Sequence, residues 1–353
     1  MQNTMNMLKR KLSPNILLSA MALALMTGCA KTNNIGQDND NVILTPHAVL
    51  AGTDNGWIVK TNDGRTFNSV FPPDGSPVHM ITAAGPNVLV LKSQLYLSDN
   101  GGVNFNPITY NKYKPQPWRD WVLNSPMHNR IYMSSTEGRG VAFSADSGRT
   151  WEVDAEWENF TSPNLRISSF AQLTNGSVYA FSDESNALYR RDNPASVWSP
   201  VLTEGNFPAP SSFFVVANTT DLFLVDYRGI GGAYYSLDEG RTWARYGDGE
   251  LPLGVGKKFV SAASSLPGKL AIATEDDVYF ATPYSSFEKA NTGLDEGTKI
   301  YAITSKYNRY KGGHISTFLY MATSKGMYRS DDGGFSWDKV SFNEYNKTYL
   351  SIY

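Results

Sequence analysis

Short segments in which apolar and polar residues alternate recur along the chain from about residue 49 to its C-terminus. They are rich in β-branched and aromatic residues, which predicts β-strands rather than helices. Pairs of such segments flank short polar loops, at residues 49–60, 131–144 and 319–330. A further apolar segment precedes most repeats, at residues 79–84, 118–123, 168–173, 213–217, 259–263 and 299–304.

A turn with a fixed pattern follows each strand pair. Four copies align without gaps, at residues 98–105 (SDNGGVNF), 144–151 (SADSGRTW), 236–243 (SLDEGRTW) and 330–337 (SDDGGFSW). A fifth copy at 60–67 (KTNDGRTF) carries Asn62 at the aspartate position, and two degenerate copies end at Trp198 and Phe287. The closing aromatic residues lie 38 to 50 residues apart, so we expect seven repeats of one four-stranded unit.

The consensus S-x-D-x-G-x-T-W resembles the Asp-box of the sialidase-like (BNR-type) propeller families. The resemblance implies an all-β, seven-bladed β-propeller with four-stranded antiparallel blades, spanning residues 42–353. The first repeat has no inner strand in front of it, whereas residues 348–353 have no repeat behind them. We therefore expect this C-terminal strand to complete the first blade and close the ring.

The carboxylates of the repeated turn pose a choice between catalysis and structure. Equivalent positions on different blades lie far apart around a rim, which is unsuitable for joint acid–base chemistry. An aspartate in such a turn can instead accept hydrogen bonds from backbone N–H groups, while the closing aromatic residue packs between sheets. We assign this structural role to Asn62, Asn100, Asp146, Asp192, Asp238, Asp332, Trp151, Trp198, Trp243 and Trp337.

The N-terminal segment predicts export and lipidation. Residues 9–11 are basic, and the apolar run 16–26 is shorter than the ~20 residues of a membrane-spanning helix. The run ends in Leu25-Met26-Thr27-Gly28-Cys29, which resembles the lipobox of bacterial lipoproteins. This implies a signal peptide (1–28), an acylated (palmitate-bearing) Cys29 and a flexible tether to residue 41. Ala30 rather than aspartate follows the cysteine; by resemblance to the sorting signals of Gram-negative lipoproteins, this implies an outer-membrane location. The alternative is an ordinary secretory signal with an incidental cysteine.

The amino-acid composition argues against several classes of function. A hydrophobic content of 41% in 353 residues is too high for a disordered chain, and a formal net charge of −2 argues against a nucleic-acid partner. The single cysteine excludes an internal disulfide framework and a thiolate zinc site. The four histidines, His47, His79, His128 and His314, have no metal-ligand spacing. We expect neither a metal nor another cofactor.

The candidate binding surface is on the face opposite the repeated turns. The two longest loops, 106–117 and 152–166, are expected there with aromatic and arginine side chains of the kind that recognition surfaces use. The candidate residues are Tyr110, Tyr113, Trp118, Arg119, Asp120, Arg139, Trp157, Phe160, Arg166, Tyr227 and Arg228. The stretch 306–311 (KYNRYK) is expected to be a solvated loop on the face that carries the repeated turns.

By blade number, length and lipoprotein signal, the chain is most similar to the photosystem II assembly and stability factor family and its non-photosynthetic bacterial relatives. This resemblance implies a monomeric, non-catalytic platform that is anchored to a membrane and binds an envelope protein or glycan. The alternative is a sialidase-like or other glycan-active hydrolase, with Asp120 and Glu137 as conceivable paired carboxylates. The nearest match to the sialidase F-R-I-P motif, residues 165–168 (LRIS), lies in mid-chain instead of near the N-terminus. No catalytic residue is therefore assigned.

Overall fold

The computed structural model describes residues 42–43, 49–62, 64–84, 87–108, 122–125, 128–134, 140–154, 167–202, 213–217, 221–226, 232–246, 258–265, 268–310, 315–340 and 349–352. The chain divides into two compact units. Of the smaller unit, only β1 (Val42–Ile43) and Tyr310 are described. Among the described residues, no helix has the length and hydropathy needed to cross a bilayer.

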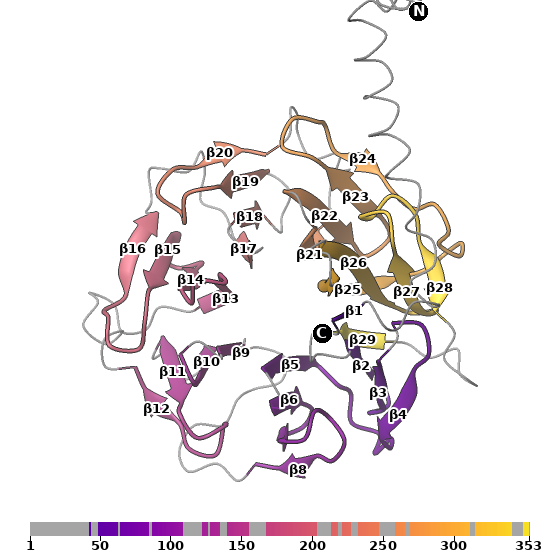
Figure 1. The fold of residues 1–353 in the computed structure, drawn as a ribbon, viewed down its shortest axis with the longest axis horizontal. Helices are drawn as coiled ribbons and strands as arrows, with labels where there is room; N and C mark the ends of the chain where they lie inside the picture. Colours follow the sequence, from indigo (N-terminus) through magenta and orange to yellow (C-terminus); the bar gives the residue numbers. More distant parts are fainter. Residues whose placement is uncertain are drawn as a thin grey trace, which may run out of the picture. The chain divides into compact units, whose positions relative to one another are not determined.

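The larger unit is a ring of antiparallel β-sheets of four strands each, which confirms the seven-bladed propeller (Figure 1). We number the blades in chain order. The strands of each blade are given in order from the first to the fourth. Blade 1 has β29 (Tyr349–Ile352), β2 (Val49–Thr53), β3 (Ile58–Thr61), β4 (Asn68–Phe71). Blade 2 has β5 (Met80–Ala84), β6 (Asn87–Leu91), β7 (Leu95–Ser98), β8 (Asn106–Pro107); blade 3 has β9 (Val122–Ser125), β10 (Arg130–Ser134), β11 (Val141–Ser144), β12 (Glu152–Val153).

The remaining blades repeat this order with similar strand lengths. Blade 4 has β13 (Ile167–Gln172), β14 (Val178–Ser182), β15 (Ala187–Arg191), β16 (Ser199–Leu202); blade 5 has β17 (Phe213–Ala217), β18 (Leu222–Asp226), β19 (Ala233–Ser236), β20 (Ala244–Arg245). Blade 6 has β21 (Phe259–Ser265), β22 (Lys269–Thr274), β23 (Val278–Ala281), β24 (Glu288–Lys289); blade 7 has β25 (Ile300–Tyr310), β26 (Ile315–Thr323), β27 (Gly326–Ser330), β28 (Asp338–Val340). The first strand of every blade lies innermost (Figure 1).

The ring closes where the sequence predicts. The C-terminal strand β29 pairs antiparallel with β2, with Ala51 opposite Ile352 and Gly52 opposite Ser351. In Figure 1 the last, yellow strand of the chain lies beside the indigo strands of its beginning. Blade 1 is thus built from both ends of the propeller, as expected.

Apolar packing lies between blades rather than in one central core. One cluster joins Leu89 and Leu95 of blade 2 to Ile131 and Met133 of blade 3, and the closing residue Trp151 is buried within it. Comparable clusters join blades 4 and 5, blades 5 and 6, and blades 6 and 7. Each blade therefore buries both of its faces only because it has a neighbour on each side.

Serine residues link neighbouring inner strands. Ser169 in β13 donates its hydroxyl to the carbonyl of Phe213 at 3.3 Å and accepts the N–H of Val215 at 3.0 Å. Ser261 in β21 makes the same pair of bonds with the carbonyl and N–H of Ile303. Both inner strands have an irregular register just before the serine. Such a bulge re-aims a side chain out of the ladder, and here the hydroxyl reaches the next blade.

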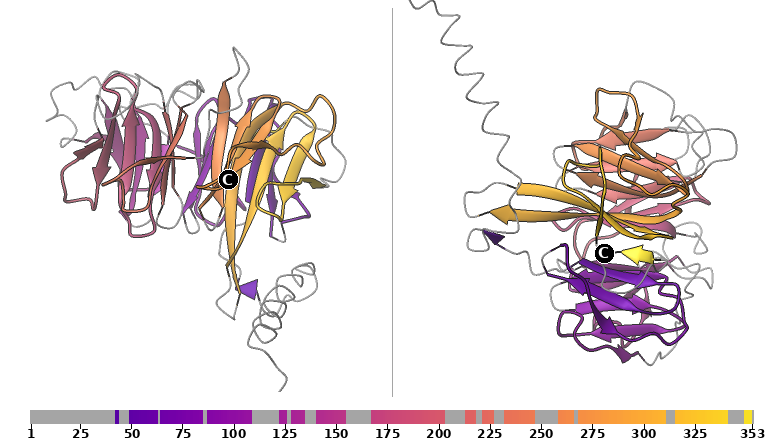
Figure 2. Two further views of the ribbon diagram at one scale, coloured as in Figure 1. Left: turned by 90° about the horizontal axis from the view of Figure 1, so that it is seen from above. Right: turned by 90° about the vertical axis from the view of Figure 1, so that its right-hand side faces the viewer.

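Two expectations about strand bounds need correction. Residues 306–310 are not in a loop, because β25 runs to Tyr310 and pairs with β26 as far as Arg309 opposite Ile315. Figure 2 shows this hairpin extending past the edges of the other blades. The inner strand expected at 118–123 is observed at Val122–Ser125, where Arg130 lies opposite Ser125 in the hairpin; residues 118–121 lie outside the described part of the chain.

Deleting residues 348–353 is expected to lower the free energy of unfolding by about 3 kcal/mol or more, because β2 then presents unpaired N–H and C=O groups at an open edge. Thermal unfolding followed by circular dichroism measures the effect. Deletion of residue 353 alone, which lies beyond β29, is the matched control and should change the melting temperature little. A truncated chain that melts with the full-length protein would show that closure does not hold the ring together.

Candidate functional site

The proposed recognition surface lies in segments that the structure does not describe. Its candidate residues Tyr110, Tyr113, Trp118, Arg119, Asp120, Arg139, Trp157, Phe160, Arg166, Tyr227 and Arg228 all fall outside the described residues, as does Cys29. The described residues instead define the turn between the third and fourth strands of each blade, which we call the box turn. Because strands alternate in direction, all box turns lie on one side of the ring, the box face.

The box turn of blade 3 holds its carboxylate in a closed set of hydrogen bonds. Asp146 Oδ1 accepts the hydroxyl of Ser144 at 2.8 Å and the N–H of Thr150 at 2.8 Å, and Oδ2 accepts the Thr150 hydroxyl at 2.7 Å. The Ser144 hydroxyl oxygen in turn accepts the N–H of Gly148 at 2.7 Å. Gly148 has φ +88°, and a Cβ there would approach Ile108 to 3.0 Å. In this turn the serine, aspartate and threonine side chains supply the hydrogen bonds, and glycine supplies the positive φ.

Asp238 and Asp332 are held in the same way. Thr242 donates its N–H and hydroxyl to the two oxygens of Asp238, and Ser336 does so to Asp332. The hydrogen bonds from Thr242 lower the pKa of Asp238 to about 2. For Asp146 and Asp332, burial opposes ionisation, but the hydroxyl and backbone donors outweigh it and lower the pKa. These carboxylates stabilise their own turns as anions and are poorly suited to donate a proton.

In blades 1 and 2 asparagine stands at the position of the aspartate, and the described hydrogen bonds use other acceptors. In blade 2, Asn100 Oδ1 accepts the N–H groups of Val103 and Asn104 at 3.1 and 3.0 Å. In blade 1, where Asn62 is exposed, the Thr61 hydroxyl oxygen accepts the N–H of Gly64 at 2.9 Å.

Blade 4 departs from the expectation for Asp192. The turn acceptor there is Asn193, whose Oδ1 takes the N–H groups of Ala195 and Ser196. Asp192 Oδ1 instead accepts the hydroxyl of Ser177 at 3.0 Å and the Nε of Arg190 at 2.5 Å. Counting back from the closing Trp198 puts residue 193, not 192, at the aspartate position.

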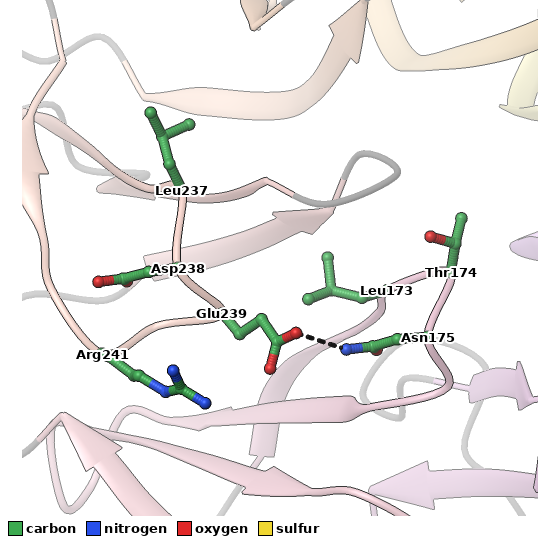
Figure 3. A pocket seen from close by; sticks show the side chains of 7 residues that line it. All are labelled: Leu173, Thr174, Asn175, Leu237, Asp238, Glu239 and Arg241. Atoms are coloured by element: carbon green, nitrogen blue, oxygen red, sulfur yellow. Dashed lines mark hydrogen bonds between the residues drawn. The ribbon is translucent and has the colours of Figure 1, made fainter.

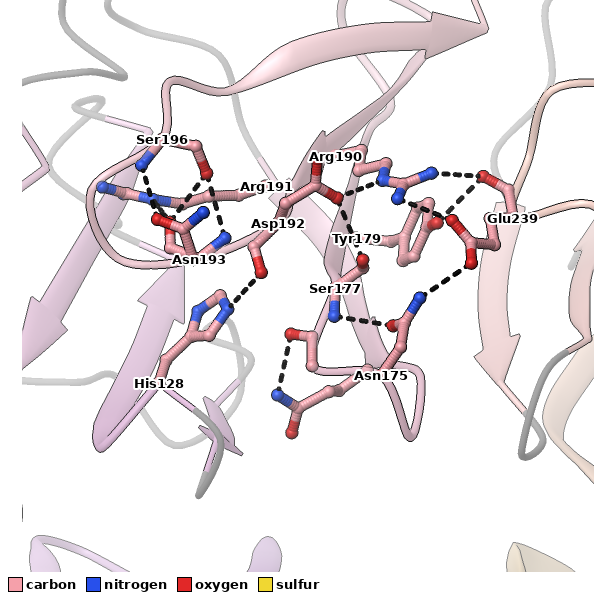
Figure 4. Close-up of polar contacts among 12 residues, drawn as sticks. His128, Asn175, Ser177, Tyr179, Arg190, Arg191, Asp192, Asn193, Ser196 and Glu239 are labelled. Atoms are coloured by element: carbon pink, nitrogen blue, oxygen red, sulfur yellow. Dashed lines mark hydrogen bonds and ion pairs between the residues drawn. The ribbon is translucent and has the colours of Figure 1, made fainter.

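Arg190 joins blades 4 and 5 at the box face (Figure 4). Its Nη2 lies 2.7 Å from Glu239 Oε2, and its Nη1 donates to the Glu239 carbonyl at 3.2 Å. Asn175 donates to the other Glu239 oxygen at 2.9 Å, and the Tyr179 hydroxyl donates to the Glu239 carbonyl at 2.9 Å. Sequence reasoning missed this clasp, because Arg190, in strand β15, and Glu239, in the box turn of blade 5, lie 49 residues apart in the chain.

A buried polar cluster joins blades 3 and 4. Arg191 pairs with Asp154, both nearly without exposure, and the Trp198 indole donates to the same carboxylate at 3.1 Å. His128 shares a hydrogen bond of 2.7 Å with the Tyr132 hydroxyl, and burial lowers its pKa. The histidine is thus neutral at pH 7 and packed within the blade interface, so a structural role accounts for its contacts.

Two small cavities open beside box turns. One of about 230 Å³ lies between blades 4 and 5 (Figure 3) and is lined by Leu173, Thr174, Asn175, Leu237, Asp238, Glu239 and Arg241. The other, of about 300 Å³ between blades 2 and 3, is lined by Leu97, Asp99, Asn106, Pro107, Ile108 and Arg149. Of the acidic groups in the first cavity, Asp238 is bound within its turn and Glu239 is paired with Arg190. Within the described part of the chain, no three His, Cys, Asp or Glu side chains gather as a metal site would require.

Comparison with known proteins supports the architecture. No protein-family model matches the chain. A xyloglucanase of Hypocrea jecorina (strain QM6a) is 25% identical over 232 residues, which cover 63% of this chain and 25% of the enzyme. Among solved structures, YCF48 bound to D1 peptide aligns with a TM-score of 0.52 and 12% identity, over 86% of this chain and 94% of that chain. An ancestral GH74 enzyme aligns with a TM-score of 0.56 and 16% identity, over 78% of this chain and 40% of that one. The chain spans a quarter of the curated relative it matches, and these similarities establish a shared propeller fold.

Replacing Asp238 with alanine is expected to lower the free energy of unfolding by about 1 kcal/mol at pH 7, because Thr242 loses two acceptors. Asp238→Asn should cost less, since Asn100 already fills this position in blade 2. Chemical denaturation measures both, with Glu288→Ala, an exposed residue in β24, as the control. Equal stability of Asp238→Ala and the parent chain would contradict the role.

The lowered pKa of Asp238 predicts that the stability lost in Asp238→Ala depends on pH. The pKa of Asp238 falls from 3.8 to about 2 on folding, so the unfolded chain takes up the proton first as the pH drops. The carboxylate's contribution is then complete above about pH 4 and is lost as the pH falls through the folded value. The difference in unfolding free energy between the parent and Asp238→Ala should stay constant above about pH 4 and shrink toward pH 2. A difference that grows on acidification would contradict this.

Proposed function

We propose that the protein is a non-catalytic binding platform of the bacterial cell envelope, which recognises an extended segment of a partner protein on the face opposite the box turns. The box turns hold their own carboxylates in hydrogen bonds, as at Asp146 and Asp238, which leaves recognition to the loops of the other face. A closed, rigid ring suits this role because it holds separate loops in fixed positions.

The observation that carries the proposal is the extent of the structural match. The similarity to YCF48 bound to D1 peptide covers nearly the whole of both chains, 86% and 94%. The matches to the GH74 enzyme and the xyloglucanase cover 40% and 25% of those enzymes. The greater part of each enzyme thus has no counterpart in the matched region, whereas the peptide-bound propeller corresponds as a unit. Because a fold does not confer a function, this supports the proposal and needs a direct test.

Glycan hydrolysis is the second candidate, and the 25% identity to a xyloglucanase favours it. It requires two carboxylates about 5–9.5 Å apart beside a sugar. Asp120 and Glu137, the pair considered from the sequence, lie outside the described residues. Binding of a glycan without cleavage would fit the same loops.

Replacing Tyr113 and Trp157 together with alanine is expected to reduce binding of peptide ligands at least tenfold, because aromatic anchors dominate recognition surfaces. Ligands selected from a displayed library of extended peptides provide the probe, and fluorescence anisotropy provides the affinity. Tyr284→Ala is the matched control, since that tyrosine is 84% exposed on the box face. Its affinity should equal that of the parent.

Two outcomes would contradict the proposal. Unchanged affinity in the Tyr113→Ala, Trp157→Ala variant would remove these residues from the site. Turnover of a xyloglucan, β-glucan or sialoside by the parent chain, lost in Asp120→Asn or Glu137→Gln, would establish the hydrolase instead.

We also propose that acylated Cys29 anchors the protein, in the outer membrane because Ala30 follows it. In cells, the mature N-terminal peptide should begin at Cys29 and carry acyl chains, detected by mass spectrometry and by incorporation of a palmitate analogue. Cys29→Ala should lose the label entirely. Met26→Leu is the control, because leucine is the more usual lipobox residue and should preserve processing. Cleavage elsewhere, or an unacylated Cys29, would favour the ordinary secretory signal.

A further inference from the structure

A buried histidine links blades 3 and 4. His128 lies in the turn between β9 and β10 of blade 3 and is only 5% exposed. Its Nε2 donates at 3.2 Å to the carbonyl oxygen of Asp192, the residue that follows β15 in blade 4 (Figure 4). Its Nδ1 lies 2.7 Å from the hydroxyl of Tyr132, a residue of β10 with no exposure. We call this contact between the two blades the histidine joint.

The partners of the ring assign its protons. A carbonyl oxygen can only accept, so the hydrogen of the neutral ring is on Nε2, which faces Asp192. Nδ1 is then an acceptor, and the Tyr132 hydroxyl is its donor. A second proton on the ring would occupy Nδ1 and meet the Tyr132 oxygen, whose own hydrogen would have to turn away. The hydrogen bonds of the closed joint therefore suit the neutral ring.

The charges that face His128 come from both blades. The Arg130 side chain of β10 and the Arg191 side chain of β15 act on it as cations, whereas the Asp192 carboxylate acts on it as an anion. That carboxylate is already engaged by Arg190 at 2.5 Å. Burial is the main cause of the lowered pKa of His128, and the repulsion from the two arginines adds to it.

The buried carboxylate of the cluster is also engaged. Asp154 accepts hydrogen bonds from Arg191 and from the Trp198 indole, and the Trp198 ring packs edge-on against Tyr132 with centroids 6.0 Å apart. Among the contacts of the described residues, neither ring nitrogen of His128 touches a carboxylate. An imidazolium in the closed joint would thus be a buried cation near two arginines, which strongly disfavours the closed arrangement.

We propose that His128 makes the interface between blades 3 and 4 sensitive to acid. When the ring takes up its second proton, the Tyr132 hydroxyl loses its acceptor, the bond to the Asp192 carbonyl breaks, and the turn after β15 separates from the turn between β9 and β10. The other interfaces of the ring stay closed. This behaviour is independent of the binding role proposed above, since it concerns the ring itself.

The direction of the effect follows from proton uptake by the two states. His128 has an ordinary pKa of about 6.5 in the open joint, whereas burial lowers its pKa in the closed joint. The open joint therefore takes up the proton first, and the stabilisation by the neutral ring is lost as the pH falls below the open value. One unit below that value, an open histidine is protonated about ten times more often than it is neutral. Opening should thus increase by up to about tenfold from pH 7.5 to pH 5.5.

Hydrogen exchange of the full chain, followed by mass spectrometry at pH 7.5 and 5.5, tests the joint. After each rate is corrected for the intrinsic effect of pH, the protection of peptides covering 128–134 and 187–198 should fall by about tenfold at pH 5.5. The interface between blades 5 and 6 is the internal control. There the buried Tyr246 hydroxyl donates to the Ala281 carbonyl at 2.9 Å, and burial raises the Tyr246 pKa. Its protection should change by less than about twofold.

Two variants identify the group that senses the acid. His128→Gln retains one donor and one acceptor but has no titratable nitrogen. It should keep the protection seen at pH 7.5 and remove the loss at pH 5.5. His79→Gln is the matched control, because His79 is exposed between β4 and β5. It should lose protection at pH 5.5 as the parent does.

Three results would overturn the proposal. Protection that is unchanged at pH 5.5 in the parent, or still lost in His128→Gln, would show that His128 is not the sensor. An equal loss between blades 5 and 6 would show that acid destabilises the whole ring instead of one joint. Titration of His128 in the folded parent by nuclear magnetic resonance, assigned by replacing the other three histidines, is independent of whether His128→Gln folds. A pKa at or above the ordinary value of 6.5 would contradict the mechanism.

Discussion

The pairing of β29 with β2 is the constraint on which the ring depends. Apolar side chains are buried between blades, as Leu89 of blade 2 is against Trp151 of blade 3. Among the described residues the apolar clusters lie between neighbouring blades, so each blade contributes stability mainly while its neighbours are in place. In an open array the two terminal sheets would each expose an apolar face and an unpaired edge. The pairing of Ala51 and Gly52 with the C-terminal strand is short. It nevertheless keeps the ring closed, and closure is what buries the apolar faces of all the blades.

Buried ion pairs at the interfaces between blades favour the correct pairing of neighbouring blades. Lys92 is fully buried, and its ammonium reaches from blade 2 to Asp74 at 2.6 Å and to the Gly56 carbonyl at 3.1 Å in blade 1. Arg191 of blade 4 is buried against Asp154 of blade 3. Desolvation cancels most of the attraction in such pairs, but a buried charge that loses its partner is strongly destabilising. A blade that docked against the wrong neighbour would bury an unpaired Lys92 or Arg191, so these pairs favour one order of blades among similar sheets.

The sequence predicted what is periodic and missed what is particular to one blade. Ring closure and six inner strands follow from spacing, and the observed β17 has the expected bounds, Phe213–Ala217. The strands at 299–304 and from residue 319 are expected from the sequence, but the stretch 306–311 has the polarity of a loop. The continuation of β25 to Tyr310, with Arg309 opposite Ile315, is local to one blade and has no counterpart in the other repeats. Asp192 was misassigned because a degenerate turn offers two adjacent polar residues, and only geometry shows that Asn193 accepts the turn's N–H groups. The clasp between Arg190 and Glu239 has no sequence signal at all, since each residue alone is an ordinary surface charge.

Within a box turn, some positions form the hydrogen bonds that hold the turn, and others only face the solvent. In blade 5, Ser236, Asp238 and Thr242 bond to each other and to the backbone, so their identity is fixed by the turn. The positions between them point outward and carry no such bond requirement: Leu237 is 62% exposed, and the position before the threonine holds Arg241 in blade 5 but Phe335 in blade 7. The turns of blades 3, 5 and 7 share one hydrogen-bond pattern and still present different side chains at their outward positions.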